Sequence, residues 1–414
     1  MRELWIVGGG RCIQFARARQ NRDNVSMNLS QAVKQHAREL GFDLVAIAPA
    51  GPSPDWQRYR AWIDAGRAGE MDYLVRHTPL KQDPRALLPE ARAIILVGLT
   101  YARHLDQTLL EDPGRGRISA YALGSDYHKI MRKALIKLDG WLAAQTGRSR
   151  RGRAFVDSAP VLERSWASRA GLGFIGKNAC LIHPEQGSWF FLGGLLVPEA
   201  LTTDPPPKLS RKGEGQELAW HFANGRVGTC GACTRCLDVC PTGALVAPRQ
   251  LDARLCISYL TIEQRGPIPR ALRPRLGNWV FGCDLCQEVC PWNRRARPAS
   301  HPKLQPHPDR IAPPLPELLA LDEAAFLARF AGSPVMRAKW AGFMRNVCVA
   351  AGNWGDPAAL APLEAHLWHS PLLVASHAAW ALARLRGGAG RKALARALAG
   401  VADASLRRII QQEL

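Results

Sequence analysis

The stretch that decides one part of the fold is "TCGACTRCLDVCPTGAL", residues 229–245, which places four cysteines within eleven positions. Their spacing is C-x2-C-x2-C-x3-C, and Pro241 follows the last of them. Bacterial ferredoxins bind four-iron, four-sulfur clusters with the same spacing. The stretch therefore predicts a chain that wraps closely around an iron–sulfur cluster.

A second cysteine run, "FGCDLCQEVCPWN", residues 281–293, has the spacing C-x2-C-x3-C-P and lacks the leading cysteine of a full run. Cys256 is the only other thiol in this region. In ferredoxin runs three close cysteines bind one cluster, and the fourth, before a proline, binds the other. This crossover rule gives cluster one Cys230, Cys233, Cys236 and Cys290, and it gives cluster two Cys240, Cys256, Cys283 and Cys286.

The alternative to clusters is zinc, because C-x2-C pairs are also common in zinc sites. Two endings of the form C-x3-C-P favour clusters instead. Disulfides are not expected in a cytosolic chain. Three further cysteines stand alone, namely Cys12, Cys180 and Cys348. Of these, Cys180 is expected to be a small buried hydrophobic residue.

The chain is strongly basic, with 55 Lys and Arg against 35 Asp and Glu and a formal charge of +20. Such a surface attracts polyanions, of which nucleic acid is the commonest, although a merely solvated basic surface is the alternative. The sequence has no apolar run long enough to span a membrane, and its first twenty residues do not form a signal peptide. We therefore expect a cytoplasmic protein.

The first large region, residues 27–201, is expected to be an α/β or α+β domain. Apolar runs at 43–48, 93–101 and 189–197 predict buried strands, and the patterns at 28–40 and 127–145 predict helices. Residues 202–228 contain three consecutive prolines and many charges, which indicates a linker or surface insertion. Residues 229–298 then form the expected two-cluster, ferredoxin-like domain.

The last region, residues 317–414, is expected to be all-α. Residues 346–367 can be laid over 377–398 at an offset of 31, so that apolar positions coincide. This pattern predicts a short HEAT-like helical repeat, with an ordinary helical bundle as the alternative. Either arrangement is expected to present a basic face through Arg345, Arg384, Arg391, Lys392, Arg396, Arg407 and Arg408.

One segment of the first region carries further candidate chemistry, namely "VDSAPVLERSWASRAGLGFIGKN", residues 156–178. Asp157 comes directly after a short apolar stretch and before a predicted helix. It is interpreted either as a helix N-cap, which its spacing alone favours, or as a proton donor with a raised pKa. The glycine-rich turn that ends the segment is not a Walker A loop, because no Ser or Thr follows Lys177.

These motifs occur in a fixed order: "GRISAYALGSDYHKIM", "VDSAPVLERSWASRAGLGFIGKN", "CGACTRCLDVCPTGAL", "GCDLCQEVCPWN" and a C-terminal helical repeat. In this order they resemble the epoxyqueuosine reductase family, which is related to reductive dehalogenases. The resemblance covers residues 27–414. It implies an oxidoreductase that uses cobalamin (vitamin B12) and two 4Fe-4S clusters to convert epoxyqueuosine to queuosine at the wobble position of tRNA.

The resemblance also implies roles for individual residues. Asp157 is expected to be the proton donor, with a pKa raised by desolvation against the cofactor. Cobalamin contacts are expected from Arg85 in "DPR", Tyr121 in "SAYALG", and the loop from Lys177 to Leu181. His128 is expected to be a structural or substrate-contacting residue rather than a cobalt ligand.

The implied partners are the anticodon stem-loop of a tRNA and an external electron donor, and the protein is expected to be a monomer without a membrane contact. Phosphate contacts are expected from the helical repeat and, beside the clusters, from Arg265, Arg270, Arg273, Arg275, Arg294, Arg295 and Arg297.

Two departures from the family pattern and three rival functions complete the expectations. Residues 1–26 precede the segment that reads like the family N-terminus at Met27, and 202–228 is longer than expected. The rivals are a cobalamin-dependent reductive dehalogenase, a ferredoxin-type electron carrier, and a nucleic-acid-binding protein whose clusters are only structural.

Overall fold

The computed structural model describes residues 29–212 and 217–414, so Cys12 and the expected extra segment 1–26 lie outside the described residues. The first region is built on a four-stranded antiparallel sheet with the strand order β1-β2-β7-β4. Its strands are β1 (Leu44–Pro49), β2 (Ala93–Thr100), β7 (Phe190–Val197) and β4 (Arg153–Phe155). The three strands predicted from apolar runs are thus confirmed.

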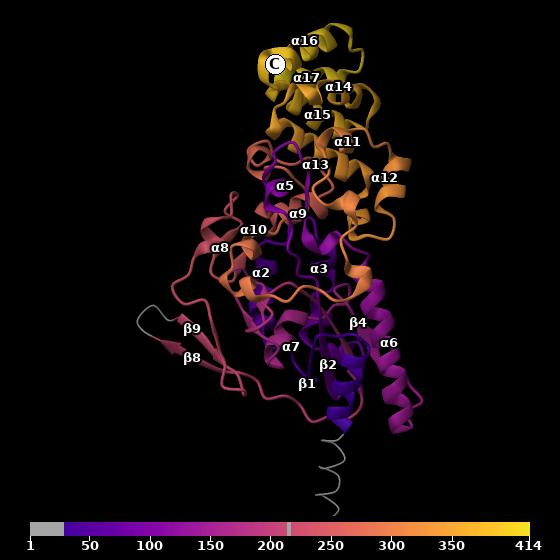
Figure 1. Cartoon of the computed structure of the whole chain (residues 1–414), viewed down its shortest axis with the longest axis vertical. Helices are drawn as coiled ribbons and strands as arrows, with labels where there is room; N and C mark the ends of the chain where they lie inside the picture. The colour runs from indigo at the N-terminus through magenta and orange to yellow at the C-terminus, as the bar shows by residue number, and fades with distance from the viewer. Residues whose placement is uncertain (1–28, 213–216) are drawn as a thin grey trace, which may run out of the picture.

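Helices cover both faces of this sheet, because its residues are apolar on both sides. Val45, Ile95 and Val97 point to one face, where they pack on α6 (Tyr127–Thr146) and on the helix over residues 29–39. Ile94 and Leu96 point to the other face and pack on α7 (Glu163–Arg169). The period of two along each strand therefore produces a three-layer α/β arrangement, as predicted (Figure 1).

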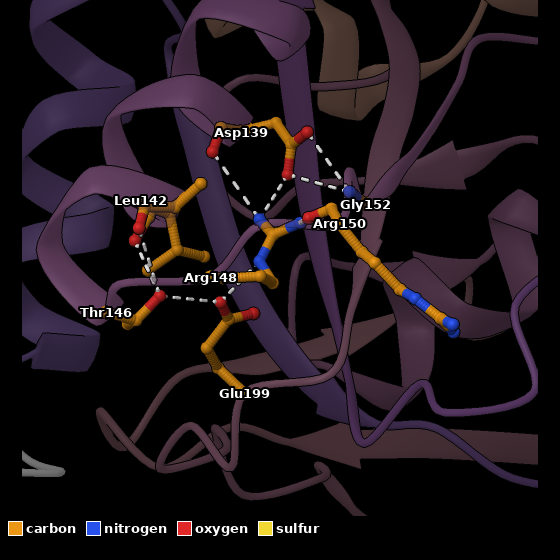
Figure 2. A network of polar contacts seen from close by, with 8 residues as sticks. Asp139, Leu142, Thr146, Arg148, Arg150, Gly152 and Glu199 are labelled. Atoms are coloured by element: carbon orange, nitrogen blue, oxygen red, sulfur yellow. Dashed lines mark hydrogen bonds and ion pairs between the residues drawn. The ribbon is translucent and has the colours of Figure 1, made fainter.

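A buried polar network fixes the C-terminal end of α6 to the edge of the sheet (Figure 2). Arg148 pairs with Asp139 on α6 and, at 2.7 Å, with Glu199 after β7. Asp139 also accepts the backbone N–H of Gly152 at 3.1 Å, directly before β4. All three charged side chains are at least nine-tenths buried. The position of α6 on the sheet therefore depends on this single guanidinium.

Shorter elements fill the connections of the first region and lead into the clusters. The helices are α2 (Trp56–Asp64), α3 (Asp72–Arg76), α4 (Thr78–Gln82) and α5 (Gln107–Glu111). The strands β5 (Phe174–Ile175) and β6 (Leu181–Ile182) pair with each other. A parallel pair, β3 (Arg117–Ile118) with β13 (Trp279–Phe281), ties the first region to the cysteine-rich region.

The segment 202–228, expected as a linker or insertion, contributes to a small sheet of order β10-β9-β8. Its strands are β8 (Lys208–Lys212), β9 (Glu217–His221) and β10 (Val227–Thr229). Trp220 and Phe222 are buried against Phe174 of β5. Two aromatic anchors hold this otherwise polar sheet on the protein; the segment's boundaries as a separate unit stay a prediction.

The cysteine-rich region has little regular structure, as expected for a chain that wraps around cofactors. It contains α8 (Arg235–Asp238), α9 (Ile257–Ile262), α10 (Leu285–Glu288), and the paired strands β11 (Leu245–Ala247) and β12 (Gln250–Leu251). The single-turn helices α8 and α10 each lie inside one cysteine run and contact each other. The two runs are therefore adjacent in space (Figure 1).

The C-terminal region is helical, and it extends the molecule away from the sheet (Figure 1). Its helices are α11 (Leu315–Leu319), α12 (Glu323–Phe330), α13 (Lys339–Trp354), α14 (Leu360–His369), α15 (Leu372–Arg384), α16 (Ala389–Gly400) and α17 (Ala404–Glu413). One continuous hydrophobic core runs from Ile118 and Phe281 to Ile410. No helix in the described part of the chain is long and apolar enough to cross a membrane.

The expectation that Arg345 lies on a basic face is wrong. Its side chain is fully buried and donates to the carbonyl oxygens of Leu260, Gln264 and Gly266. Leu260 lies in α9, and Gln264 and Gly266 follow that helix. Arg345 therefore joins α13 to the cysteine-rich region. Helical spacing alone does not distinguish such a buried cation from an exposed one.

Candidate active site and cluster-binding region

Asp157 lies just beyond the end of β4 in a backbone conformation that few residues adopt. Its φ is 54°, in the left-handed region where asparagine and aspartate are the best tolerated residues after glycine. The N-cap interpretation is wrong, because α7 begins only at Glu163 and its capping position is Leu162. The loop instead turns the carboxylate toward the N-terminus of α6.

Two consecutive residues of α6 contact this carboxylate. The hydroxyl group of Tyr127 donates a hydrogen bond to Oδ2 of Asp157 at 2.8 Å, and Nε2 of His128 lies 3.6 Å from the same oxygen. On its other side, Nδ1 of His128 lies 2.8 Å from Oδ1 of Asp126, which also caps α6. The imidazole ring is therefore held between two carboxylates.

The Asp157 carboxylate lies in a hollow. Tyr127 and His128 of α6 flank it on one side, and 65% of its side-chain surface is open to solvent. A small cavity of about 130 Å³ adjoins it, lined by His128, Lys129, Arg132, Val156 and Ser158. An acid that is both enclosed and accessible is well placed to meet a substrate.

The protein's own residues lower the pKa of Asp157, whereas the expected rise depends on a bound cofactor and stays a prediction. Burial alone would raise this pKa, but the hydrogen bonds from His128 and Tyr127 outweigh it, and the net shift is downward. For His128 burial acts in the opposite sense, yet Asp126 and Asp157 raise its pKa to about 9. At neutral pH the pair therefore holds one proton, and that proton resides on the imidazole.

A second acid, Glu163, lies next to Asp157 and was not singled out from the sequence. Burial, together with the charge of Asp157, raises its pKa to about 8, although Lys81 acts to lower it. Its Oε1 atom and the Nε1 atom of Trp166, one turn later on α7, are buried without a hydrogen-bond partner among the described residues. Two unpaired polar atoms on one helix face indicate that a polar group belongs there.

The thiols that influence one another's pKa are consistent with the two sets of the crossover rule, which stays a prediction. Burial and the neighbouring thiols of Cys230, Cys290 and Cys233 raise the pKa of Cys236 to about 11. In the second set, burial raises the pKa of Cys283, and the thiols of Cys256 and Cys240 add to the rise.

Cys286 joins the second set, because Cys283 and Cys256 are among the thiols that raise its pKa, after Cys180 and burial. The fold thus brings Cys256 to the second run across the intervening chain. Whether each cysteine is a ligand stays a prediction.

Cys180 also lies among these thiols, which the sequence did not indicate. Its side chain hydrogen-bonds to Cys286, and it is among the thiols that raise the pKa of Cys290. Lys177, expected to contact cobalamin, binds the first cysteine loop: its backbone N–H lies 3.4 Å from Sγ of Cys230, and its Nζ donates to the Gly231 carbonyl at 2.7 Å. The turn after β5 therefore packs against both cysteine sets.

The other expected cobalamin contacts lie in different surroundings. Arg85 forms an ion pair with Asp83 at 2.5 Å and is 46% exposed. Leu181 is a core residue of β6, only 4% exposed. Tyr121 lies between the two candidate sites, because its ring contacts both Tyr127 and Phe281. Of these three residues, Tyr121 is thus the one whose ring packs on a residue that binds Asp157.

The ring of Tyr121 connects the Asp157 hollow to the second cysteine set. Its centroid lies 6.3 Å from that of Tyr127, which binds Asp157, and 6.1 Å from that of Phe281. Cys283 follows two residues after Phe281. An acid, a path of packed aromatic rings and paired thiol sets define the class of oxidoreductases that supply electrons from iron–sulfur clusters to a substrate.

Comparisons with known proteins specify this class further. Residues 229–293 match the family model described as "4Fe-4S double cluster binding domain", and residues 81–158 match "Epoxyqueuosine reductase QueG, DUF1730". The chain is 41% identical to the epoxyqueuosine reductase of Xanthomonas campestris pv. campestris, over 85% of this chain and 95% of the relative. It is 42% identical to that of Escherichia coli K12, over 86% and 89%. The chain belongs to the epoxyqueuosine reductase family.

Solved structures agree with this membership. An epoxyqueuosine reductase crystallised with an epoxyqueuosine-modified tRNA-Tyr stem loop superposes with a TM-score of 0.81 at 28% identity, covering 93% of this chain and 98% of that one. The Bacillus subtilis enzyme, with an aspartate-bearing catalytic loop swung out of its active site, gives a TM-score of 0.79 with the same identity and coverage. The double-cluster match also favours clusters over zinc in the cysteine-rich region.

Proposed function

We propose that this protein reduces epoxyqueuosine to queuosine at the wobble position of tRNA. Two electrons and two protons remove the epoxide oxygen as water and leave an alkene in the cyclopentane ring. The observation that carries the proposal is the accessible Asp157 carboxylate, which packed aromatic rings join to the second of two four-cysteine sets. The family membership and the double-cluster match support the same reaction.

Cobalamin fits the two unpaired polar atoms at the start of α7, where Glu163 lies next to Asp157. Oε1 of Glu163 and Nε1 of Trp166 are an acceptor and a donor, or two donors when Glu163 is protonated, and the rim of a corrin ring carries amides that pair with both kinds. Glu163 and Trp166 would hold the cofactor together with Tyr121 and the predicted contacts Arg85, Lys177 and Leu181. When bound, cobalamin supplies a low-potential cobalt centre that accepts single electrons and delivers them to the substrate.

The protein's own acids supply the protons. Asp157 is the proposed donor to the departing oxygen, because it is the accessible carboxylate of the hollow. Its lowered pKa means that it must receive a proton before it can give one, and His128 holds that proton 3.6 Å away. The role agrees with the aspartate-bearing catalytic loop described for the Bacillus subtilis relative.

The tRNA is proposed to bind across α6. Lys129, Arg132, Lys133 and Lys137 lie exposed along this helix, and no ion pair is formed by any of them within the described part of the chain. Cations in the first turns oppose the helix dipole, so they are not there to stabilise α6. They begin one residue after His128, and the first two of them, Lys129 and Arg132, line the hollow, where phosphates next to the wobble nucleotide would pass.

Several arginines expected to bind phosphate have other contacts. Arg273 is buried and donates to the Ile268 carbonyl at 2.9 Å, so this expectation is wrong. Arg270 pairs with Glu413 at 2.7 Å, and Arg265 donates to the Arg337 carbonyl. The other members of the predicted set, Arg275, Arg294, Arg295 and Arg297, are exposed and form no ion pair within the described part of the chain.

The finer architecture is also part of the proposal. We assign residues 27–201 to a cobalamin-binding domain and 229–298 to a ferredoxin-like domain. Residues 317–414 form a HEAT-like repeat, since α13 with α14 and α15 with α16 have the same order at an offset of 31. The superposed residues Ala350 and Ala381, and Leu363 and Leu394, are all fully buried. A cytoplasmic monomer that receives electrons from an external donor fits this assignment.

Turnover tests the proposal. Protein with reconstituted clusters and bound cobalamin is mixed anaerobically with a strong reductant and tRNA carrying epoxyqueuosine, and the digested nucleosides are weighed by mass spectrometry. The modified nucleoside should lose one oxygen atom only when cobalamin is present. An unchanged nucleoside, with clusters intact and cobalamin bound, would overturn the proposal and indicate a different reducible substrate.

A further inference from the structure

The first cysteine set lies in an exposed part of the molecule. Ala232, Thr234 and Arg235, which surround Cys233 in the chain, are all exposed. The single turn of α8 thus carries Cys236 at the surface. Figure 1 shows α8 and α10 on one side of the molecule and α6 on the other.

The two cysteine sets lead in different directions through the protein. The second set leads inward, since Cys283 follows Phe281, whose ring contacts Tyr121 and through it the Asp157 hollow. The first set packs elsewhere: Cys230 and the buried Cys290 lie in a small hydrophobic cluster with Phe174 and Trp220, beside the β8–β10 sheet. Electrons used at Asp157 therefore pass through the second set, and the first set is where they enter.

Arginines form a rim around this entry point. Arg235 lies on α8, and Arg294 and Arg295 lie on the short helix η5 (Pro291–Arg295), followed by Arg297. All four are exposed, and none forms an ion pair in the described part of the chain. The indole of Trp292 donates to the Thr229 carbonyl at 3.1 Å, which fixes η5 beside the first cysteine loop.

Acidic residues near the rim do not neutralise it. Asp238 on α8 is exposed and accepts a hydrogen bond from Thr234 at 2.7 Å. Glu288 on α10 is paired with Arg117 at 2.5 Å. Four arginines against one unpaired acid leave a net positive surface next to the partly exposed thiols of the first set.

We infer that this arginine rim docks a small acidic protein that carries one electron at a time, such as a flavin or [2Fe–2S] carrier. Each encounter oxidises the carrier by one electron and reduces a cluster by one, and two encounters supply one substrate. Such partners meet over small, charge-steered contacts, which suits a rim of four side chains. The inference rests on the proposed function, because it assigns the external donor of that reaction.

A tRNA is the competing occupant of the same charges, and the geometry disfavours it. The substrate nucleotide must reach Asp157, which α6 flanks. The arginine rim instead lies beside the first cysteine set, which packs against Phe174 and Trp220. RNA bound at the rim would cover the electron entry point and not approach the hollow. The rim and α6 therefore serve different partners on opposite sides of the molecule (Figure 1).

The test uses the double variant Arg294→Glu/Arg295→Glu of the cluster-loaded protein. The control, Arg391→Glu/Lys392→Glu, makes the same charge change on exposed positions of the distant helix α16. Bleaching of the cluster absorbance is followed in stopped flow, with either a photoreduced acidic [2Fe–2S] ferredoxin or photoreduced deazariboflavin, an uncharged reductant. Dissociation constants for the ferredoxin and for tRNA are measured on the same samples.

The rim variant should be reduced by the ferredoxin at least tenfold more slowly, with weaker ferredoxin binding and a smaller dependence on salt. Its reduction by deazariboflavin and its tRNA affinity should stay within twofold of wild type, as should the reduction of the control by either donor. Unchanged ferredoxin kinetics, or a loss of tRNA affinity instead, would overturn the inference. Failure of the proposed function is distinguishable, because deazariboflavin-reduced wild type would then leave the nucleoside unchanged.

Discussion

The cysteine-rich region and the proton site assemble in opposite ways. Seven of the eight predicted cluster cysteines come from two short runs, and each run contains its own single-turn helix. The proton site instead combines α6, the loop after β4, the start of α7 and Lys81, which meet only because the central sheet holds them. The spacing of the cysteines in the sequence therefore determines the predicted cluster sites. Packing between distant segments determines which residue of the proton site holds the proton.

Cys256 is the exception within the first of these regions, and its removal gives the largest expected effect. Cys256→Ala should abolish turnover and lower the iron content from about eight to about four atoms per chain, because a four-iron cluster needs its fourth thiolate. Iron analysis and electron paramagnetic resonance measure this. Cys180→Ala is the matched control, since this thiol also contacts Cys286; loss of a cluster there and not in Cys256→Ala would contradict the assignment.

The next largest effect concerns the packing on which the proton site depends. Arg148→Met removes the only cation of the buried network in Figure 2 and leaves Asp139 and Glu199 without it. Breaking such a buried pair costs about 3–5 kcal/mol of unfolding free energy, measured by urea denaturation. Arg150→Met is the control, because that side chain is 84% exposed, and it should change stability by less than about 0.5 kcal/mol. Equal effects would show that the network does not anchor α6.

The basic face of α6 gives a smaller, binding-specific effect. Lys129→Ala/Arg132→Ala should weaken tRNA binding about tenfold, and the slope of log Kd against log salt should fall by about 1.4 as two phosphate contacts are lost. Fluorescence anisotropy with an anticodon stem-loop measures both quantities. Lys208→Ala/Arg211→Ala, at two exposed positions of β8 on the side of the molecule away from α6 (Figure 1), serves as the control. An unchanged slope in the α6 variant would remove this helix from the binding surface.

The smallest expected effect is a change in pH dependence. Since the pKa of His128 is raised to about 9, its proton is lost as the pH rises through that value, and turnover should decline there. The same sign holds for stability: the contribution of His128 is fully present below its ordinary pKa near 6.5 and is lost by about pH 9. His128→Gln should lower turnover about tenfold at neutral pH and abolish this alkaline decline. A decline near pH 9 that persists in the variant would assign it to another group.

The features that the sequence predicts are those set by local pattern, and the features that it misses are those set by long-range packing. The cysteine spacing and the apolar strands of the central sheet follow from local pattern, so the grouping of thiols and the α/β layers could be predicted. The direction of the pKa shift of Asp157 could not, because it is set by Tyr127 and His128, thirty residues earlier, across a contact between α6 and the loop after β4.

The sequence also does not show which arginine side chains are exposed to solvent. Arg345 and Arg273 resemble surface cations by composition, and only packing shows that carbonyl oxygens hold them inside. Glu163 and Trp166 carried a weak signal, three residues apart on one helix face, but their unpaired atoms are visible only in three dimensions.

The measurement that tests the central claim most directly is a single turnover of Asp157→Asn. Clusters and cobalamin are loaded and reduced in wild type and variant alike, and oxygen loss from epoxyqueuosine in tRNA is followed by mass spectrometry. We expect both cofactors to bind and to be reduced normally in the variant, while oxygen loss slows at least a hundredfold, because an amide cannot donate the proton. A variant that removes the oxygen at the wild-type rate would contradict the role of Asp157.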